Sequence, residues 1–168
     1  GESWKCAITY RPVDLRSMKG DIKLLYYEKA CAKGVELSIK ISDNFSSMMM
    51  LDELRIKQVF FNIGGNAVKF TKEGYIMINA NFSAIDETNG DLTIEVEDSG
   101  IGIAESQKSK IFDAFVQQSG QSNRAYGGAG LGLTISKRLV EKMNGSISVS
   151  SQLFKGSVFK IFIPGIEF

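Results

Sequence analysis

The chain alternates between two spacings of hydrophobic residues, one typical of strands and the other typical of helices. Apolar residues occupy every second position from Val35 to Ile41, which predicts a half-buried strand. Before this strand, apolar residues recur at helical spacing at Met18, Ile22, Leu25 and Tyr26. Asp14 is a residue type that caps helix N-termini, and Gly34 is one that ends helices. The pattern therefore predicts a helix between Asp14 and Gly34, followed by a strand.

Predicted helices and strands also follow one another along the rest of the chain. Asn89-Gly90 lies between two strand-like segments and is a strong signal for a hairpin turn, while Asn144-Gly145 ends the last helical segment. The predicted elements are a helix at 52–70, strands at 75–82 and 92–97, a helix at 131–143, and strands at 146–151 and 157–163. We therefore expect one domain over residues 1–168, an α/β two-layer sandwich in which helices cover one face of a mixed, mostly antiparallel sheet.

The composition argues against several classes of function. The chain has 20 basic and 19 acidic residues, so it lacks the basic excess of a nucleic-acid-binding surface. No apolar stretch approaches the roughly 20 residues that cross a bilayer, so we expect no direct membrane insertion. Cys6 and Cys31 are too few for a disulfide framework and predict free thiols in a reducing compartment. The chain contains no histidine, which excludes histidine-based triads and histidine-ligated metals.

The predicted helix at 52–70 carries three polar residues that could bind a charged ligand. Asn62, Asn66 and Lys69 are spaced i, i+4 and i+7 and therefore share one helix face. An amide oxygen suits a Mg²⁺ ion whose charge is already balanced by phosphates, and a lysine ammonium can meet phosphate oxygens. The alternative is that both asparagines are ordinary surface or capping residues.

Residues 98–132 are rich in glycine, serine and glutamine, and such a long irregular stretch in a compact domain is usually functional. Asp98, Gly100 and Gly102 follow a predicted strand directly. The glycines would let the backbone approach a ligand closely, and the carboxylate can accept a hydrogen bond from an exocyclic amine such as that of adenine. The alternative is an ordinary turn.

A glycine-rich segment at 127–132 opens the last predicted helix. Free N–H groups at a helix N-terminus form an anion site, which suits phosphates. The spacing fits neither the dinucleotide-binding GxGxxG pattern nor a Walker A loop, and the alternative is a flexible connector. A short apolar helix is expected around 111–115, where Phe112 and Phe115 either enter the core or form a docking surface.

The order of these segments is far more specific than any one of them. Together they resemble the N, G1, F and G2 boxes of the catalytic and ATP-binding domain of sensor histidine kinases. This domain belongs to the superfamily shared with DNA gyrase, Hsp90 and MutL, and has the Bergerat-type ATP-binding fold. The resemblance runs from Tyr10 to Pro164, and segments 124–128 and 135–145 favour the histidine kinase branch, often of hybrid type.

The resemblance implies a role for each matching residue. Asn66 would be the main Mg²⁺ ligand with Asn62 assisting, Lys69 would contact phosphate oxygens, and these three would form the catalytic set. Asp98 would bind the adenine amine. Residues 117–130 would form a mobile ATP lid. The residues implied to contact ATP are Asn62, Asn66, Lys69, Phe70, Asp98, Gly100, Gly102, Ile103, Arg124, Gly128, Ala129, Gly130, Leu131 and Gly132.

The resemblance also implies a histidine protein kinase that is incomplete in this chain. The γ-phosphoryl group of Mg-ATP would pass to a histidine on a separate dimerisation domain of the same protein, which Phe112 and Phe115 would face. A response-regulator receiver domain would be a further partner. The parent is expected to be a homodimer, possessing a cytoplasmic catalytic domain even where it is anchored in a membrane. The chain begins at Gly1 without methionine, so we expect it to be a piece of a longer protein.

Three departures from the family pattern bear on nucleotide affinity. Ala129 stands where the family commonly has Thr or Ser, and Gln117 where some members place Arg. Gly64-Gly65 replaces bulkier residues inside a helix, at a cost of roughly 0.5–1 kcal/mol each relative to Ala. These departures motivate a second hypothesis, a nucleotide-binding regulatory module that no longer transfers phosphate. A third, an ATPase clamp, needs a Glu one turn before the metal-binding Asn, and Asn62 occupies that position.

Overall fold

The computed structural model describes residues 7–42, 48–113 and 129–168, with side chains of the last segment described from Leu133 onward. In chain order the elements are β1 (Arg11–Val13), a 3-10 helix η1 (Leu15–Met18), α1 (Lys19–Ala32), β2 (Val35–Ile41), β3 (Met49–Leu51), α2 (Glu53–Phe70), β4 (Gly74–Ala84), β5 (Asn89–Asp98), α3 (Glu105–Lys108), α6 (Ala129–Lys142), β6 (Ser146–Gln152) and β7 (Gly156–Glu167). Every long element predicted from the sequence is present, within a few residues of its expected ends.

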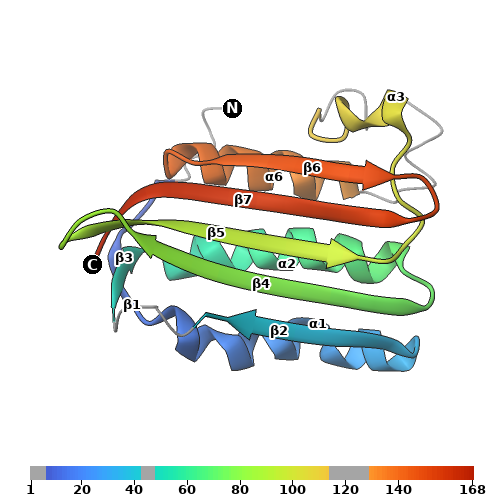
Figure 1. Ribbon diagram of the computed structural model, residues 1–168, viewed down its shortest axis with the longest axis horizontal. Coiled ribbons are helices and arrows are strands. Elements are labelled where there is room, and N and C mark those ends of the chain that lie inside the picture. Colours follow the sequence, from blue (N-terminus) through green and yellow to red (C-terminus); the bar gives the residue numbers. More distant parts are fainter. Residues whose placement is uncertain (1–6, 43–47, 114–128) are drawn as a thin grey trace.

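A five-stranded sheet with the order β2-β4-β5-β7-β6 forms one layer of the molecule. β2 pairs parallel with β4, and the other three pairs are antiparallel. α1, α2 and α6 cover one face of this sheet (Figure 1). The predicted two-layer sandwich with a mixed, mostly antiparallel sheet is therefore confirmed. No helix of the described segments is both long and apolar enough to span a bilayer.

A second, two-stranded sheet was not predicted. β1 and β3 pair antiparallel, with Arg11 opposite Leu51 and Val13 opposite Met49. Each strand has only three residues, too few for an alternating pattern to stand out. This small sheet is joined to the start of α2, because the N–H of Thr9 donates to Asp52 Oδ2 at 2.7 Å.

The core lies between the sheet and the helices. On β5 the inward residues alternate as predicted for a half-buried strand and are almost fully buried: Leu92, Ile94 and Val96. α2 contributes a buried stripe at helical spacing: Ile56, Val59, Phe60 and Ile63. Full burial of one such side chain stabilises the fold by about 1.5–3 kcal/mol, so this stripe fixes α2 against the sheet.

The hairpin between β4 and β5 is present, but its turn lies earlier than the sequence suggests. Residues 85–88 form the loop, and the Asp86 carboxylate accepts hydrogen bonds from the N–H groups of Thr88 and Asn89 at 2.9 and 2.8 Å. Asn89 and Gly90 already belong to β5. A Cβ on Gly90 would lie 2.3 Å from Phe82 Cζ, so this glycine makes room for an aromatic ring. The prediction of Asn89-Gly90 as the turn is therefore wrong.

The prediction of a short helix at 111–115 is wrong for the part of that range that the structure describes. The structure instead has α3 at Glu105–Lys108, followed by turns through Phe112. Residues 114–115 lie outside the described segments. Apolar residues at 111 and 112 suggested a helix. In the structure, the four-residue helix α3 and the tight turns after it bury Ile111 just as effectively.

Gly64 lets α1 and α2 pack closely. Tyr26 of α1 is buried, and its hydroxyl donates to the Phe60 carbonyl of α2. A Cβ on Gly64 would lie 2.6 Å from Tyr26 Cζ, whereas a Cβ on Gly65 would meet nothing within 4 Å. Burial raises the pKa of Tyr26, so the hydroxyl stays protonated and able to donate. The two neighbouring glycines are therefore not equivalent.

This difference gives a paired test of stability. We expect Gly65→Ala to raise the free energy of unfolding by about 0.5–1 kcal/mol, because alanine is the better helix former. Gly64→Ala gains the same propensity but collides with Tyr26, so we expect net destabilisation. Urea denaturation of both variants measures the effects. Stabilisation by both substitutions would contradict the packing role of Gly64.

Phe154 gives a second stability test, at the tip of the β6–β7 hairpin. It has φ +65° and is 81% exposed, so its backbone is in the left-handed region without core packing in return. We expect Phe154→Gly to raise the free energy of unfolding by about 1 kcal/mol. Phe154→Ala keeps the Cβ and is the control for losing the ring. Equal effects of Gly and Ala in thermal or urea denaturation would show that backbone strain is not the cause.

Candidate nucleotide-binding site

Three segments that carry candidate residues meet at one end of the molecule. The C-terminal end of α2, the carboxyl end of β5 and the N-terminal end of α6 all lie at the right of Figure 1. α2 packs against both α6 and β5, so the three elements are held together. A helix N-terminus is electropositive and a buried carboxylate is electronegative, so this edge offers two kinds of recognition side by side.

α2 positions the predicted metal- and phosphate-binding residues. The Asp52 carboxylate caps the helix by accepting from the N–H of Arg55 at 3.2 Å. Asn62 and Asn66 are half-buried and Lys69 is exposed, with its Nζ 5.9 Å from the centre of the Phe70 ring. Asn66 Nδ2 is buried with no hydrogen-bond partner in the described part of the chain. A buried amide donor without a partner is costly in the free protein, so Asn66 is a candidate for contact with a ligand that accepts hydrogen bonds.

Lys33 fixes the end of α2 from a neighbouring element. Its Nζ donates to the carbonyls of Val68 and Lys69 at 2.6 and 3.2 Å, which satisfies carbonyls that have no partner within the helix. The N–H of Ile101 donates to the Phe70 carbonyl at 3.4 Å. The helix end is therefore tied both to α1 and to the loop after β5.

Asp98 lies at the end of β5 and is only 7% exposed. Its carboxylate accepts from the N–H of Gly100 at 2.8 Å and from the N–H of Ser157 on β7. Burial raises the pKa of Asp98, these two hydrogen bonds partly oppose the rise, and the neighbouring Glu97 charge adds to it. Two acceptor positions of the carboxylate remain for an outside donor such as an exocyclic amine.

The glycines after Asp98 are required by the protein's own backbone. A Cβ on Gly100 would lie 2.5 Å from the Phe70 carbonyl oxygen. Gly102 has φ +74°, and a Cβ there would lie 2.2 Å from the Gln152 carbonyl oxygen. The sequence suggested that these glycines admit a ligand, whereas the structure shows them admitting α2 and the β6–β7 hairpin. Their contact with a nucleotide stays a prediction.

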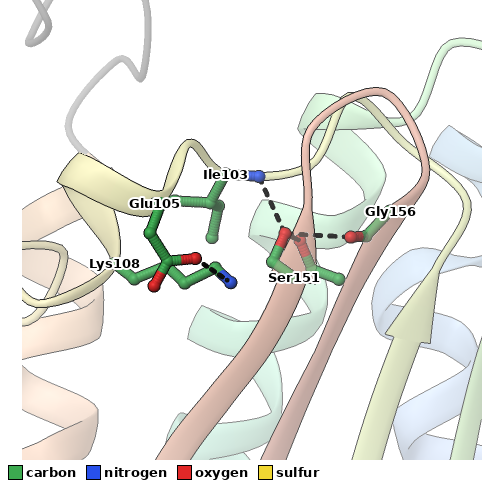
Figure 2. Close-up of polar contacts among 6 residues, drawn as sticks. Ile103, Glu105, Lys108, Ser151 and Gly156 are labelled. Carbon is green, nitrogen blue, oxygen red and sulfur yellow. Dashed lines mark hydrogen bonds and ion pairs between the residues drawn. The ribbon is translucent and has the colours of Figure 1, made fainter.

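A pair of serines on β6 and β7 holds the same loop in place. Ser151 Oγ accepts from the N–H of Ile103 at 2.8 Å, lies 2.9 Å from the Gly156 carbonyl oxygen, and lies 2.8 Å from Ser157 Oγ (Figure 2). α3 beside it has an exposed Lys108–Glu105 ion pair at 2.9 Å. The sequence did not single out Ser151 or Ser157, because serine fills four of the seven positions of β6 and only the strand register brings Ser157 opposite Asp98.

Phe112 is partly a core residue. Its ring packs edge to face on Phe159 with centroids 6.2 Å apart, and Thr134 Oγ1 donates to its carbonyl at 2.9 Å. It remains half-buried, so its docking role stays a prediction. Phe115, Gln117, Arg124, Gly128 and most of the lid expected at 117–130 lie outside the described residues. Ala129, Gly130, Leu131 and Gly132 form the first turn of α6, where the sequence predicted a helix start.

The side chains of the candidate site decide which kind of metal ion could bind there. Within the described segments, no group of three or more His, Cys, Asp or Glu residues could hold a metal ion. The amide of Asn66 is a neutral oxygen ligand, and a hard cation such as Mg²⁺ commonly takes one or two protein ligands together with phosphate oxygens. The residues present therefore fit a magnesium ion that arrives with a nucleotide.

Known proteins with a similar sequence are much longer than this chain. The chain is 37% identical over 158 residues to the signal transduction histidine-protein kinase BarA of Escherichia coli, covering 94% of this chain and 17% of BarA. It is 39% identical to the autoinducer 2 sensor kinase/phosphatase LuxQ of Vibrio vulnificus, over 97% of this chain and 19% of LuxQ. The chain thus spans about a fifth of the length of these relatives.

Solved structures and a family model agree with these relatives. A crystal structure of full-length ShkA in complex with AMPPNP is similar with a TM-score of 0.80 and 34% identity, over 96% of this chain and 32% of ShkA. The catalytic domain of the histidine kinase ThkA is similar with a TM-score of 0.69 and 26% identity, over 93% of this chain and 95% of that domain. Residues 51–166 match the family described as histidine kinase-, DNA gyrase B- and HSP90-like ATPase, and the chain belongs to this family as an ATP-binding catalytic domain of the sensor histidine kinase type.

Proposed function

We propose that this chain binds Mg-ATP and donates the γ-phosphoryl group to a histidine on a separate dimerisation domain. The observation that carries the proposal is the buried carboxylate of Asp98, held beside the end of the helix that bears Asn66 and Lys69. Asp98 accepts the exocyclic amine of adenine, and its burial makes that hydrogen bond strong because water competes poorly there. The nucleotide then extends from Asp98 toward Asn66, Lys69 and the first turn of α6.

Phosphoryl transfer needs alignment and neutralisation of charge more than covalent help. Lys69 provides a positive charge to the phosphates, while the N-terminal amides of α6 donate to phosphate oxygens. Asn66, assisted by Asn62, would hold a magnesium ion, which neutralises phosphate charge when bound. A ring nitrogen of the acceptor histidine forms a bond to the γ-phosphorus as the bond to the bridging oxygen breaks, and the electron pair leaves with ADP.

The partners follow from the lack of a nucleophile in the chain itself. The chain contains no histidine, so the acceptor belongs to another domain. The relatives' greater length supports a parent protein with further domains, and the names of BarA and LuxQ support kinase activity in such a parent. We propose that these domains include the dimerisation domain with the acceptor histidine, and that the phosphoryl group passes on to a receiver domain. We further propose a homodimeric parent, of hybrid type, whose catalytic domain works in the cytoplasm.

A regulatory module that binds nucleotide without transferring phosphate is the second candidate. Ala129, which removes a hydroxyl near the expected phosphates, still supports it. Gly64 no longer does, because its lack of a side chain is explained by the packing of Tyr26. An ATPase clamp has less support, because Asn62 cannot act as the general base that activates water.

Nucleotide binding by the isolated chain tests the role of Asp98. We expect Asp98→Ala to weaken ATP, ADP and adenosine by at least about tenfold, because an amine donor loses a charged acceptor. Asp91→Ala removes a carboxylate at the other end of β5 and is the matched control, expected to leave the affinities unchanged. Calorimetry measures all three ligands. Normal binding by Asp98→Ala would exclude adenine recognition by this residue.

The raised pKa of Asp98 predicts two pH effects of opposite sign. Ligand affinity should fall as the pH drops through the raised pKa, because the protonated acid no longer offers the same acceptor. The free protein should behave oppositely: the buried charge disfavours folding at neutral pH, and this unfavourable contribution disappears as Asp98 is protonated. Asp98→Asn should therefore stabilise the free protein more at neutral pH than at an acidic pH below the raised pKa, as measured by urea denaturation. A stabilisation that does not depend on pH would contradict this.

Phosphotransfer to a separate acceptor domain tests Asn66. We expect Asn66→Ala and Asn66→Asp to lower transfer of label from γ-labelled ATP by at least about tenfold, because the metal ligand is removed or its charge altered. Asn81→Ala, at an exposed position of β4, is the control. The dependence of transfer on Mg²⁺ concentration should shift in the Asn66 variants and not in the control. Unchanged transfer by both Asn66 variants would rule out the assignment.

A further inference from the structure

Thr71 has a fully buried hydroxyl at the C-terminal end of α2. It follows α2 directly and has 0% exposure, and its Oγ1 has no hydrogen-bond partner among the described residues. Burying a hydroxyl without a partner is unfavourable, because its bonds to water are lost and nothing replaces them. Valine would fill the same space without this cost. The hydroxyl therefore needs an explanation beyond packing.

The surroundings of Gly100 show where this hydroxyl lies. A Cβ on Gly100 would be 3.0 Å from Thr71 Oγ1, 3.0 Å from Asp98 Oδ1 and 2.5 Å from the Phe70 carbonyl oxygen. Three oxygens from α2 and β5 thus converge beside one Cα atom. An ionised carboxylate and a carbonyl only accept hydrogen bonds, so the Thr71 hydroxyl is the one group of the three that can donate.

We infer that Thr71 is a positioning residue for base recognition, whose hydroxyl donates to the Asp98 carboxylate, directly or through one water, when a nucleotide is bound. Asp98 Oδ1 already accepts the N–H of Gly100 at 2.8 Å. The N–H of Ser157 also donates to this carboxylate, so Thr71 would be a third donor. A third donor fixes the rotation of the carboxylate and leaves its last lone pair for the amine of the base. The inference rests on the proposed role of Asp98 in binding adenine.

The position of Thr71 in the fold makes this role specific. The N–H of Ile101 donates to the Phe70 carbonyl at 3.4 Å, so the end of α2 and the loop after Asp98 are joined next to Thr71. The same helix carries Asn66 and Lys69, which face the phosphates in the proposed function. α2 would then contact both ends of the nucleotide, and Thr71 would couple the orientation of the base to that of the phosphates.

Isosteric substitution tests the inference on the whole chain. We expect Thr71→Val to unfold at a temperature no lower than the parent, yet to bind ATP, ADP and adenosine about five- to tenfold more weakly. The loss should be equal for the three ligands because the base, not the phosphate, is affected. Thr71→Ser should restore binding. ITP lacks the exocyclic amine. The ratio of the affinity for ATP to the affinity for ITP should therefore be smaller in Thr71→Val than in the parent chain, as measured by calorimetry.

Two further comparisons keep the result interpretable. Thr71→Ala and Thr71→Ser differ only in the hydroxyl. If Thr71→Val does not fold, the ratio of the nucleotide affinities of these two variants measures the contribution of the hydroxyl. Ser136→Ala removes another fully buried hydroxyl without a described partner, on α6, and is expected to leave affinity unchanged.

The outcomes separate this inference from the proposal on which it rests. Parent-like affinity in Thr71→Val, or equal affinities in Thr71→Ala and Thr71→Ser, would overturn the inference. If Asp98→Ala weakens nucleotide while the Thr71 variants do not, base recognition by Asp98 stands and only the role of Thr71 is wrong. If Asp98→Ala binds normally, the assignment of the base site itself is wrong, and the inference about Thr71 is wrong with it.

Discussion

The buried carboxylate of Asp98 is the constraint on which the arrangement of the site depends. Its charge is disfavoured by burial, as its raised pKa indicates, and it is tolerated because the N–H groups of Gly100 and Ser157 donate to it. Both donors need the backbone of the following loop and of β7 to approach within hydrogen-bonding distance. Gly100, Gly102 and Gly156 permit this approach, because a Cβ on any of them would overlap a neighbouring oxygen. Glycine at these positions thus permits the close backbone packing around this charge.

The close packing of α1 against α2 sets the position of α2, the helix that carries Asn62 and Asn66. Tyr26 sits in the space left by Gly64 and donates to the Phe60 carbonyl, while Lys33 holds the C-terminal end of the same helix. A glycine inside a helix is unfavourable by itself, and here the packing of a large buried side chain offsets that cost. α1 therefore fixes both the lateral position and the end of α2, and with them Asn66, Lys69 and Thr71.

The site also contains polar atoms that the free protein leaves unsatisfied. Asn66 Nδ2 and Thr71 Oγ1 are buried without partners in the described segments, and both belong to the last part of α2 or its cap. Natural proteins retain few such atoms, because each lowers stability. Of these atoms, Thr71 Oγ1 lies close to Asp98, since both it and Asp98 Oδ1 would be 3.0 Å from a Cβ on Gly100. Unsatisfied atoms at this end of α2 are consistent with stability given up for ligand binding.

The sequence by itself determined the fold class and the order of the elements, because hydrophobic periods of 2 and 3.6 residues follow directly from strand and helix geometry. It also identified Asn66, Lys69 and Asp98 as candidates, since their residue types fall at recognisable spacings. Only the tertiary structure decided the packing at Gly64, the burial of the Thr71 hydroxyl and the register that places Ser157 opposite Asp98. It also decided the pairing of β1 with β3 and the true turn before Asn89. These features depend on contacts between residues far apart in the chain, and such contacts leave no local periodic pattern in the sequence.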